Sequence, residues 1–94
     1  MFVLFVDMKL KPGAQAGLEK TYVETFRPAI SQQEGFRGVE LLHPNQAGGQ
    51  WRLSIAFESH DLRKKWVALD LHQDVWARME SYFADYSVND YTSV

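Results

Sequence analysis

The order of strands and helices that can be read along the 94 residues is the feature that most limits how this chain folds. Runs of apolar and alternating residues predict four strands, over residues 2–10, 36–43, 51–57 and 84–94. Helical periodicity predicts helices between them, over residues 14–33 and 60–83. The predicted order is therefore β-α-β-β-α-β, in a single domain that spans residues 1–94.

This order is the split β-α-β order of the ferredoxin-like α+β fold, which we expect to form a four-stranded antiparallel sheet with its helices on one face. The first strand is apolar on both faces: Phe2, Leu4, Val6, Met8 and Leu10 on one, Val3 and Phe5 on the other. Such a strand is predicted to be central and covered on both sides. Because helices supply only one cover, we expect a partner to cover the other face.

The next two strands divide their side chains differently. The third strand alternates and places four large apolar side chains on one face: Trp51, Leu53, Ile55 and Phe57. The second strand mixes its faces, with Val39 and Leu41 predicted on one side and Phe36 and Leu42 on the other. Residues 44–50, which include Gly48 and Gly49, predict a hairpin loop between them.

The first helical segment has one apolar stripe with a spacing of four: Leu18, Tyr22, Phe26 and Ile30, with Val23 beside it. Pro28 lies inside this stripe and cannot donate a hydrogen bond to the Glu24 carbonyl. A kink or an early end of the helix is therefore expected near Pro28.

The second helical segment is predicted to break near Asp70. Ser59 is a suitable N-cap for its first part, and Asp70 followed by Gln73 resembles a second capping box. The apolar stripe changes at this point, from Leu62, Trp66 and Leu69 to His72, Trp76, Met79 and Phe83. The break should let Trp66 and His72 face the same side of the sheet, which their spacing of six on one straight helix would prevent.

Composition excludes several functional classes. The net charge is −2 without a basic block, which argues against nucleic-acid binding, and no cysteine is present for disulfides or thiolate chemistry. The longest apolar run, at residues 2–6, is too short for a membrane span, so we expect a cytoplasmic protein. The three histidines have no paired spacing, and His43 and His60 border loops and should face solvent, so no metal site is predicted.

His72 and Trp66 are the leading candidates for a functional site. A histidine near the start of a helix is favoured in its neutral form and could act as a base. The alternative is a packed histidine that is hydrogen-bonded to a backbone carbonyl. Trp66 could form a flat wall for an aromatic ligand or could simply fill the core.

Asp7 is the one acidic residue expected on a covered strand face. A buried carboxylate needs a partner, and Arg52 or Arg37 could supply it. Asp7 could also be an acid or base with a perturbed pKa, although an ion pair is the favoured interpretation.

Several segments together resemble the antibiotic biosynthesis monooxygenase family, within the dimeric α+β-barrel superfamily. They are Lys-Pro-Gly at residues 11–13, Glu-Gly-Phe-Arg-Gly-Val-Glu-Leu at 34–41, the strand from Trp51 to the Phe-Glu-Ser step at 57–59, and Trp66 with His72. The resemblance covers nearly the whole chain. It implies a homodimer packed through the sheets, with a pocket in each protomer between sheet and helices.

Members of the family differ in chemistry, and the resemblance implies two kinds. Some oxidise phenols with dioxygen and without metal or flavin, whereas others degrade haem. The haem-degrading branch uses a helix Trp, which Trp66 matches, together with a strand Asn and a His ten residues after the Trp. Val6 and Trp76 stand at those two places, so haem degradation is disfavoured.

The resemblance therefore favours a cofactor-independent monooxygenase that acts on a small aromatic or polyketide-like phenol. We expect Trp66, Trp76 and Phe26 to wall its cavity, His72 to accept the phenol proton, and Tyr22 or Arg52 to donate to the anion. One alternative is a non-catalytic, dimeric small-molecule-binding or stress-associated module. The other is a purely structural dimer whose aromatic residues all lie in core and interface.

Overall fold

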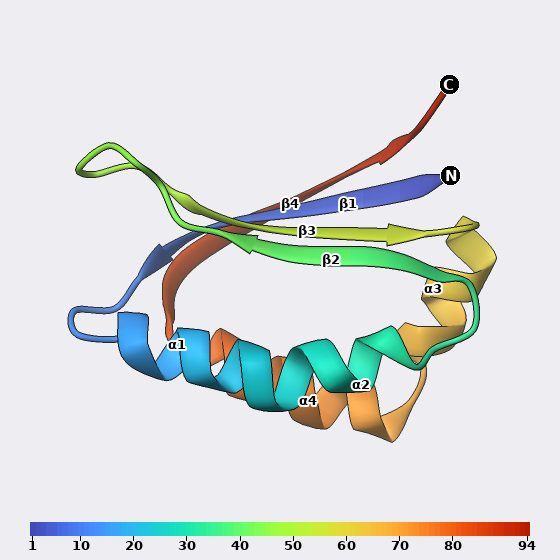
Figure 1. Ribbon diagram of the computed structural model, residues 1–94, viewed down its shortest axis with the longest axis horizontal. Helices are drawn as coiled ribbons and strands as arrows, with labels where there is room; N and C mark the ends of the chain where they lie inside the picture. Colours follow the sequence, from blue (N-terminus) through green and yellow to red (C-terminus); the bar gives the residue numbers. More distant parts are fainter.

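A computed structural model describes residues 1–94 and has the predicted ferredoxin-like α+β fold (Figure 1). The strands are β1 (Phe2–Leu10), β2 (Phe36–Leu42), β3 (Trp51–Phe57) and β4 (Phe83–Thr92). The helices are α1 (Gln15–Thr21), the π-helical turn η1 (Tyr22–Phe26), α2 (Arg27–Ser31), α3 (His60–Val67) and α4 (Asp70–Glu80). None of these helices combines the length and apolar character needed to cross a membrane.

The four strands form one antiparallel sheet in the order β2-β3-β1-β4, so β1 is central as predicted. All helices lie on one side of it, and we call that side the inner face (Figure 1). The core consists of sixteen buried hydrophobic residues, and it includes all four alternating side chains of β3 and the first four inner residues of β1. No polar or charged residue is fully buried.

The first helical segment keeps its stripe of Leu18, Tyr22, Phe26 and Ile30 buried although its spacing of four exceeds the 3.6 residues of an α-helical turn. Over these residues an ideal α-helix would rotate the stripe by about 120°. The π-helical turn η1, in which the Arg27 N–H donates to the Tyr22 carbonyl, offsets part of that rotation because it has more residues per turn. The helical path thus adjusts just before Pro28 and then continues through α2.

Three details of the predicted core are wrong. Val23 is 46% exposed and Leu69 is 39% exposed, so neither belongs to a buried stripe. Phe36 lies on the inner face, where its ring packs edge-on against Phe57, because a β-bulge between Phe36 and Gly38 shifts the register by one residue. Leu42 stays on the outer face, opposite Arg52.

The predicted break between the last two helices is confirmed, but a capping box does not cause it. The Ser59 hydroxyl caps α3 by accepting from the Leu62 N–H at 3.2 Å. Leu69 then adopts an extended backbone and precedes α4 without a side-chain cap. Helix α4 ends at Glu80 and Phe83 already belongs to β4, so the predicted helix over 60–83 is too long.

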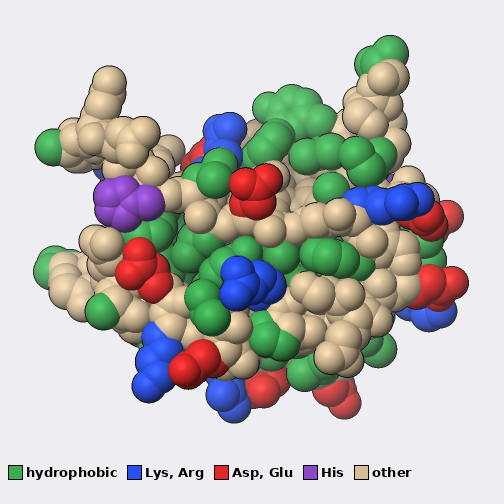
Figure 2. Space-filling model, in the orientation of Figure 1, with side chains coloured by type: hydrophobic (Ala, Val, Ile, Leu, Met, Phe, Trp, Pro, Cys, Tyr) green, Lys and Arg blue, Asp and Glu red, His purple; other side chains and the backbone are tan.

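The side of the sheet away from the helices, the outer face, is covered by no element of the chain (Figure 1). Val3, Phe5 and Tyr91 lie there, with Phe5 and Tyr91 in edge-to-face contact at 5.7 Å. Asp7 accepts two hydrogen bonds from Arg52, at 2.7 and 3.0 Å, which confirms the expected ion pair with Arg52, one of the two candidate partners. Hydrophobic side chains are visible both above the sheet and between sheet and helices in Figure 2.

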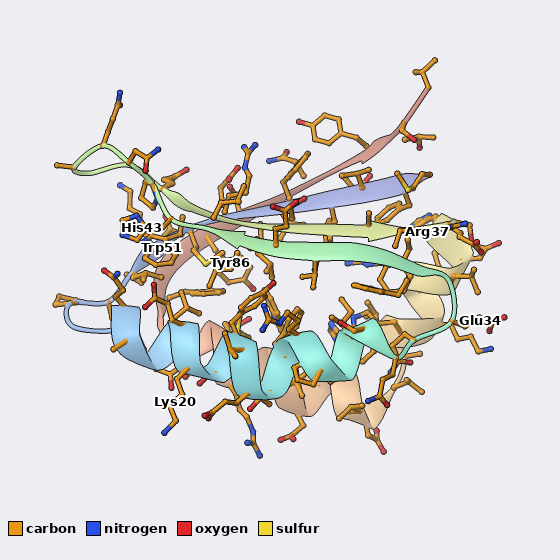
Figure 3. All side chains as sticks on the ribbon, in the orientation of Figure 1. Lys20, Glu34, Arg37, His43, Trp51 and Tyr86 are labelled. Carbon is orange, nitrogen blue, oxygen red and sulfur yellow. The ribbon has the colours of Figure 1, made fainter.

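Charged side chains elsewhere are at the surface. Arg37 pairs with Glu58, and Lys65 pairs with Glu34, at the end of the molecule where β2 begins. His43 is exposed beside Trp51 at the opposite end, and Lys20 points away from the sheet (Figure 3). His60 is also exposed, stacked on Phe2 at 5.0 Å.

Candidate functional site

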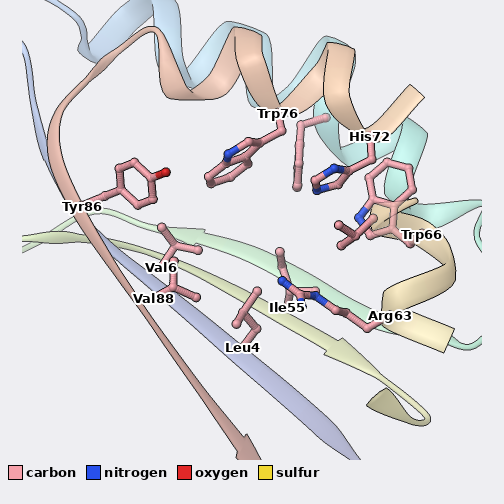
Figure 4. A pocket seen from close by; sticks show the side chains of 11 residues that line it. Leu4, Val6, Ile55, Arg63, Trp66, His72, Trp76, Tyr86 and Val88 are labelled. Atoms are coloured by element: carbon pink, nitrogen blue, oxygen red, sulfur yellow. The ribbon is translucent and has the colours of Figure 1, made fainter. Parts of the chain in front are cut away.

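A cavity of about 130 Å³ lies between the inner face of the sheet and the helices (Figure 4). Strands β1, β3 and β4 contribute five lining side chains: Leu4, Val6, Ile55, Tyr86 and Val88. The helical layer contributes the other six: Phe26, Arg63, Trp66, Val67, His72 and Trp76. Nine of these eleven residues are hydrophobic, so the cavity suits an apolar ligand with few polar groups.

The break at Leu69 brings Trp66 and His72 together at this cavity. Their ring centroids are 5.0 Å apart in an edge-to-face arrangement. His72 is also parallel to Trp76, with centroids 6.5 Å apart, because the two residues are one turn apart on α4. Phe26 completes the aromatic wall, at 6.5 Å from Trp66 and 6.2 Å from Trp76. Four residues predicted for the site therefore share one cavity.

His72 has an environment that favours its neutral form. Burial is the main cause that lowers its pKa, and the positive charge of Arg63 lowers that pKa further. The Nδ1 atom of His72 is buried and has no hydrogen-bond partner. The structure thus lacks the bond from Nδ1 to a backbone carbonyl that the packed-histidine alternative requires, and Nδ1 remains able to accept or donate a proton.

Arg63 lines the same cavity and was not predicted as a site residue. Its Nε atom is buried without a partner, and its guanidinium carbon lies 5.7 Å from the centre of the Phe2 ring. In the sequence it is one of three adjacent basic residues and resembles a solvated helix face. The signal that could have found it is its position three residues before Trp66, which places both on one side of α3.

Tyr86 is the second lining residue that sequence reasoning missed. Its hydroxyl donates to Glu80 Oε2 at 2.9 Å, and Trp76 Nε1 donates to the same oxygen at 3.0 Å. The hydrogen bond to Glu80 is the main cause that raises the pKa of Tyr86. One carboxylate therefore fixes two aromatic side chains between α4 and β4. Tyr86 is 41% exposed and marks the side on which the cavity approaches solvent.

Tyr22 and Arg52, the two expected donors, do not line the cavity. Tyr22 is buried in the core, its hydroxyl donates to the Val39 carbonyl at 3.3 Å, and burial is the main cause that raises its pKa. Arg52 lies on the outer face, because it alternates with the inward-facing residues of β3, and there it pairs with Asp7. The expectation that either donates to a ligand in this cavity is therefore not met.

The residues form no cluster of metal ligands and do not match the ligand set of the haem-degrading branch. No group of three or more His, Asp or Glu side chains is placed to hold a metal ion. Val6 and Trp76, which stand where the haem-degrading branch has its Asn and His, both line the cavity and cannot bind iron. His72 is the only imidazole there.

Comparison with known proteins agrees with this architecture. Three solved structures illustrate the likeness: a candidate antibiotic biosynthesis monooxygenase from Caulobacter crescentus, SnoaB from Streptomyces nogalater, and a mutant of MhuD. The Caulobacter protein is 17% identical, with a TM-score of 0.85 over 99% of this chain and 89% of its own. SnoaB, a cofactor-independent oxygenase, is 18% identical, with a TM-score of 0.82 over 99% and 93%. MhuD, crystallised with two manganese protoporphyrin IX molecules per active site, is 18% identical, with a TM-score of 0.76 over 100% and 95%.

At these identities the likeness establishes the fold and nothing finer. No curated protein sequence matches the chain. The family model described as antibiotic biosynthesis monooxygenase matches residues 1–78, which include β1 to β3, α3 and most of α4. This chain therefore belongs to the antibiotic biosynthesis monooxygenase family.

Proposed function

We propose that this protein is a cofactor-independent monooxygenase that oxidises a small phenol bound between sheet and helices. The observation that carries the proposal is the aromatic cavity in which His72 presents a buried, unpartnered Nδ1. Membership of the family supports it, as does the similarity of the fold to SnoaB, which is a cofactor-independent oxygenase.

The proposed reaction requires only two contributions from the protein, which are transfer of a proton and exclusion of water. In the proposed reaction His72 Nδ1 accepts the phenol proton, so the O–H bond breaks and an N–H bond forms. The electron-rich phenolate then reduces dioxygen directly. A ring C–H bond and the O–O bond break, and one oxygen atom enters the ring as a second carbonyl. The other oxygen atom leaves as water with the ring hydrogen and the phenol proton, so that a phenol is converted to a quinone. The indoles of Trp66 and Trp76 are roughly perpendicular, because His72 is edge-to-face with the first and parallel to the second. A bound ring would stack on one indole and meet the other edge-on, and together with Phe26 they keep water from the reacting atoms.

The volume of the cavity limits the size of the proposed substrate. An apolar cavity of about 150 Å³ engineered into another protein holds benzene. The cavity of about 130 Å³ therefore fits one aromatic ring. A polycyclic phenol of the polyketide kind would enter only if the Tyr86–Glu80–Trp76 hydrogen bonds opened, so we place single-ring phenols first among substrates.

We also propose that the active form is a homodimer joined through the outer faces of two sheets. Val3, Phe5 and Tyr91 form an uncovered apolar surface there, and the only charged pair among them, Asp7–Arg52, is already neutralised. An interface above about 1,200 Å² of total buried area would be ordinary for such a pair.

Oxygen uptake with a panel of single-ring phenols, naphthols and tricyclic phenols tests the proposed activity. The panel is screened first by thermal shift, and uptake is measured on each compound that stabilises the protein. Uptake by a single-ring phenol is expected, with formation of the quinone and entry of one atom of the dioxygen into the ring. Compounds that stabilise the protein but consume no oxygen would instead establish the alternative, a non-catalytic small-molecule-binding dimer, which the same cavity would serve.

A further inference from the structure

We propose that Arg63 and His72 form a subsite for one anionic oxygen of a single-ring aromatic ligand. The inference rests on the proposed function, because it specifies the ionised state in which the substrate is held. It assigns to Arg63 a specificity-determining contact that the aromatic wall alone cannot make.

The first observation is that two buried polar atoms in one cavity lack partners. They are Arg63 Nε, which is a donor, and His72 Nδ1, which can donate or accept. They are the only buried side-chain nitrogen or oxygen atoms of the protein without a hydrogen bond. Buried polar groups are almost always paired in folded proteins. Two exceptions in the same small cavity point to a polar atom that a ligand brings.

The second observation is the charge of the cavity. Arg63 carries a permanent positive charge, and no Asp or Glu lines the cavity to balance it. The four ion pairs of the protein use Arg37, Arg52, Lys65 and Arg78 instead. A ligand with a single negative charge would neutralise this corner, whereas a cation would be repelled by it.

The third observation is position. Arg63 comes from α3 and His72 from α4, and both side chains extend toward the space beneath Trp66 and Trp76 (Figure 4). An aromatic ring stacked on one of the two indoles, and meeting the other edge-on, would therefore present an oxygen substituent to Arg63 and His72. Two routes place an anionic oxygen at this position, and they differ by one proton on His72. A phenol gives its proton to His72 Nδ1, or a ligand that is already anionic accepts hydrogen bonds from Arg63 and from the Nδ1–H tautomer of His72.

Equilibrium binding of 4-nitrophenol without oxygen tests the subsite independently of turnover. The ionised form of this single-ring phenol is yellow and the protonated form is colourless, so the absorption spectrum reports which form is bound. We expect the wild-type protein to bind the phenolate and to lower the apparent pKa of the ligand. Its methyl ether, 4-nitroanisole, has the same ring but no acidic proton and serves as the neutral probe. Benzoate tests whether a carboxylate oxygen can replace the phenolate.

Two variants give the comparison its control. Arg63→Met should weaken binding of the phenolate by about 10- to 100-fold, the usual effect of losing a charged hydrogen bond, and should leave binding of 4-nitroanisole unchanged. Lys64→Met removes the same charge from the exposed neighbouring position and should change neither ligand. Thermal melts of both variants verify folding, and Arg63→Lys, which keeps the charge but loses Nε, should recover only part of the affinity.

The outcomes separate this proposal from the proposed function. Equal binding of phenolate by wild type and Arg63→Met, or equal preference for the neutral ether, would overturn the subsite while leaving oxygenase activity possible. Selective phenolate binding without oxygen uptake would support the subsite and tell against the oxygenase. Selective binding of benzoate over the phenolate would also support the subsite, but would identify an aromatic acid as the ligand.

Discussion

The two faces of the sheet handle their polar groups in opposite ways. On the outer face the one ion pair is satisfied: Asp7 accepts two hydrogen bonds from Arg52, whose guanidinium carbon also lies 4.6 Å from the centre of the Phe5 ring. On the inner face, in a much more apolar setting, Arg63 and His72 each leave a buried nitrogen unpaired. An exposed apolar surface beside a satisfied ion pair suits a protein partner, whereas unpaired atoms in a cavity suit a ligand.

This difference has an energetic meaning. An unsatisfied buried polar group costs about 1–3 kcal/mol, so the inner face retains two such costs that the fold itself does not require. A bound anion would remove both costs by accepting hydrogen bonds from these atoms, and this gain in free energy would favour binding. The outer face has no buried polar atom that lacks a partner, so its contribution to the free energy of association must come from burial of apolar area.

The sharpest test of the inner face is His72→Ala. If His72 accepts the phenol proton, turnover should fall by about 10²–10⁴-fold while binding changes much less. Single-turnover kinetics per folded dimer, with His43→Ala as the control for an exposed histidine outside the cavity, measures the loss. Equal activity per folded dimer would end the case for His72 as the base, and lower stability with unchanged turnover would leave it a packing residue.

Stability should depend strongly on the inner face of β3. Leu53 is fully buried, so Leu53→Ala should destabilise the fold by about 2–5 kcal/mol. Ile55→Ala should lower the free energy of unfolding by an amount nearer the lower end of this range, because Ile55 already borders the cavity. Denaturant unfolding measures both, with Ser54→Ala on the opposite face of the same strand as the near-neutral control. Unchanged midpoints would contradict the burial of this face.

Association should depend on the outer face alone. Phe5→Glu would place a charge in the proposed interface and should raise the dimer dissociation constant at least about 100-fold, or about 2.8 kcal/mol. Sedimentation velocity at micromolar concentration measures it. Leu71→Glu, at a 45% exposed position on the helical side, should leave the dimer intact. A wild-type protein that is monomeric under these conditions would refute the proposed dimer.

The pH dependence of stability should carry a small signature of His72. Burial and Arg63 lower its folded-state pKa below the unfolded value near 6.5, so the unfolded chain binds the proton more readily. Stability is then unaffected above that value and falls as the pH drops from about 6.5 through the lower folded pKa. In His72→Gln this component should be absent, and in Arg63→Met it should shrink. Chemical unfolding measured at several pH values between about 7.5 and about 5 would show this loss of stability.

Much of this architecture follows from local patterns. The alternation of β3 and the stripe change near Asp70 were sufficient to predict the sheet face and the meeting of Trp66 with His72. The prediction that Arg52 donates to a ligand anion was wrong. It relied on the guanidinium group alone, whereas the alternation of β3 places Arg52 on the outer face. Phe36 was misplaced because a one-residue bulge between Phe36 and Gly38 inverts parity, and the signal that could have indicated it is Gly38, a glycine inside a strand. Arg63 was not predicted as a site residue because a basic residue on a helix usually faces solvent, and the sequence does not show the cavity around it.

The π-helical turn at Tyr22–Phe26 makes the length of this helix unusually adjustable. Loss of the exposed Val23 would leave Leu18 and Ile30 separated by three ordinary α-helical turns, with a residual rotation of only about 20°. The same four side chains would still point into the core, and Phe26 would still reach the cavity. Most helices that build a core cannot lose a residue without turning one side outward. Here one residue can be removed without turning the buried side chains outward, so a one-residue deletion should be tolerated at this turn.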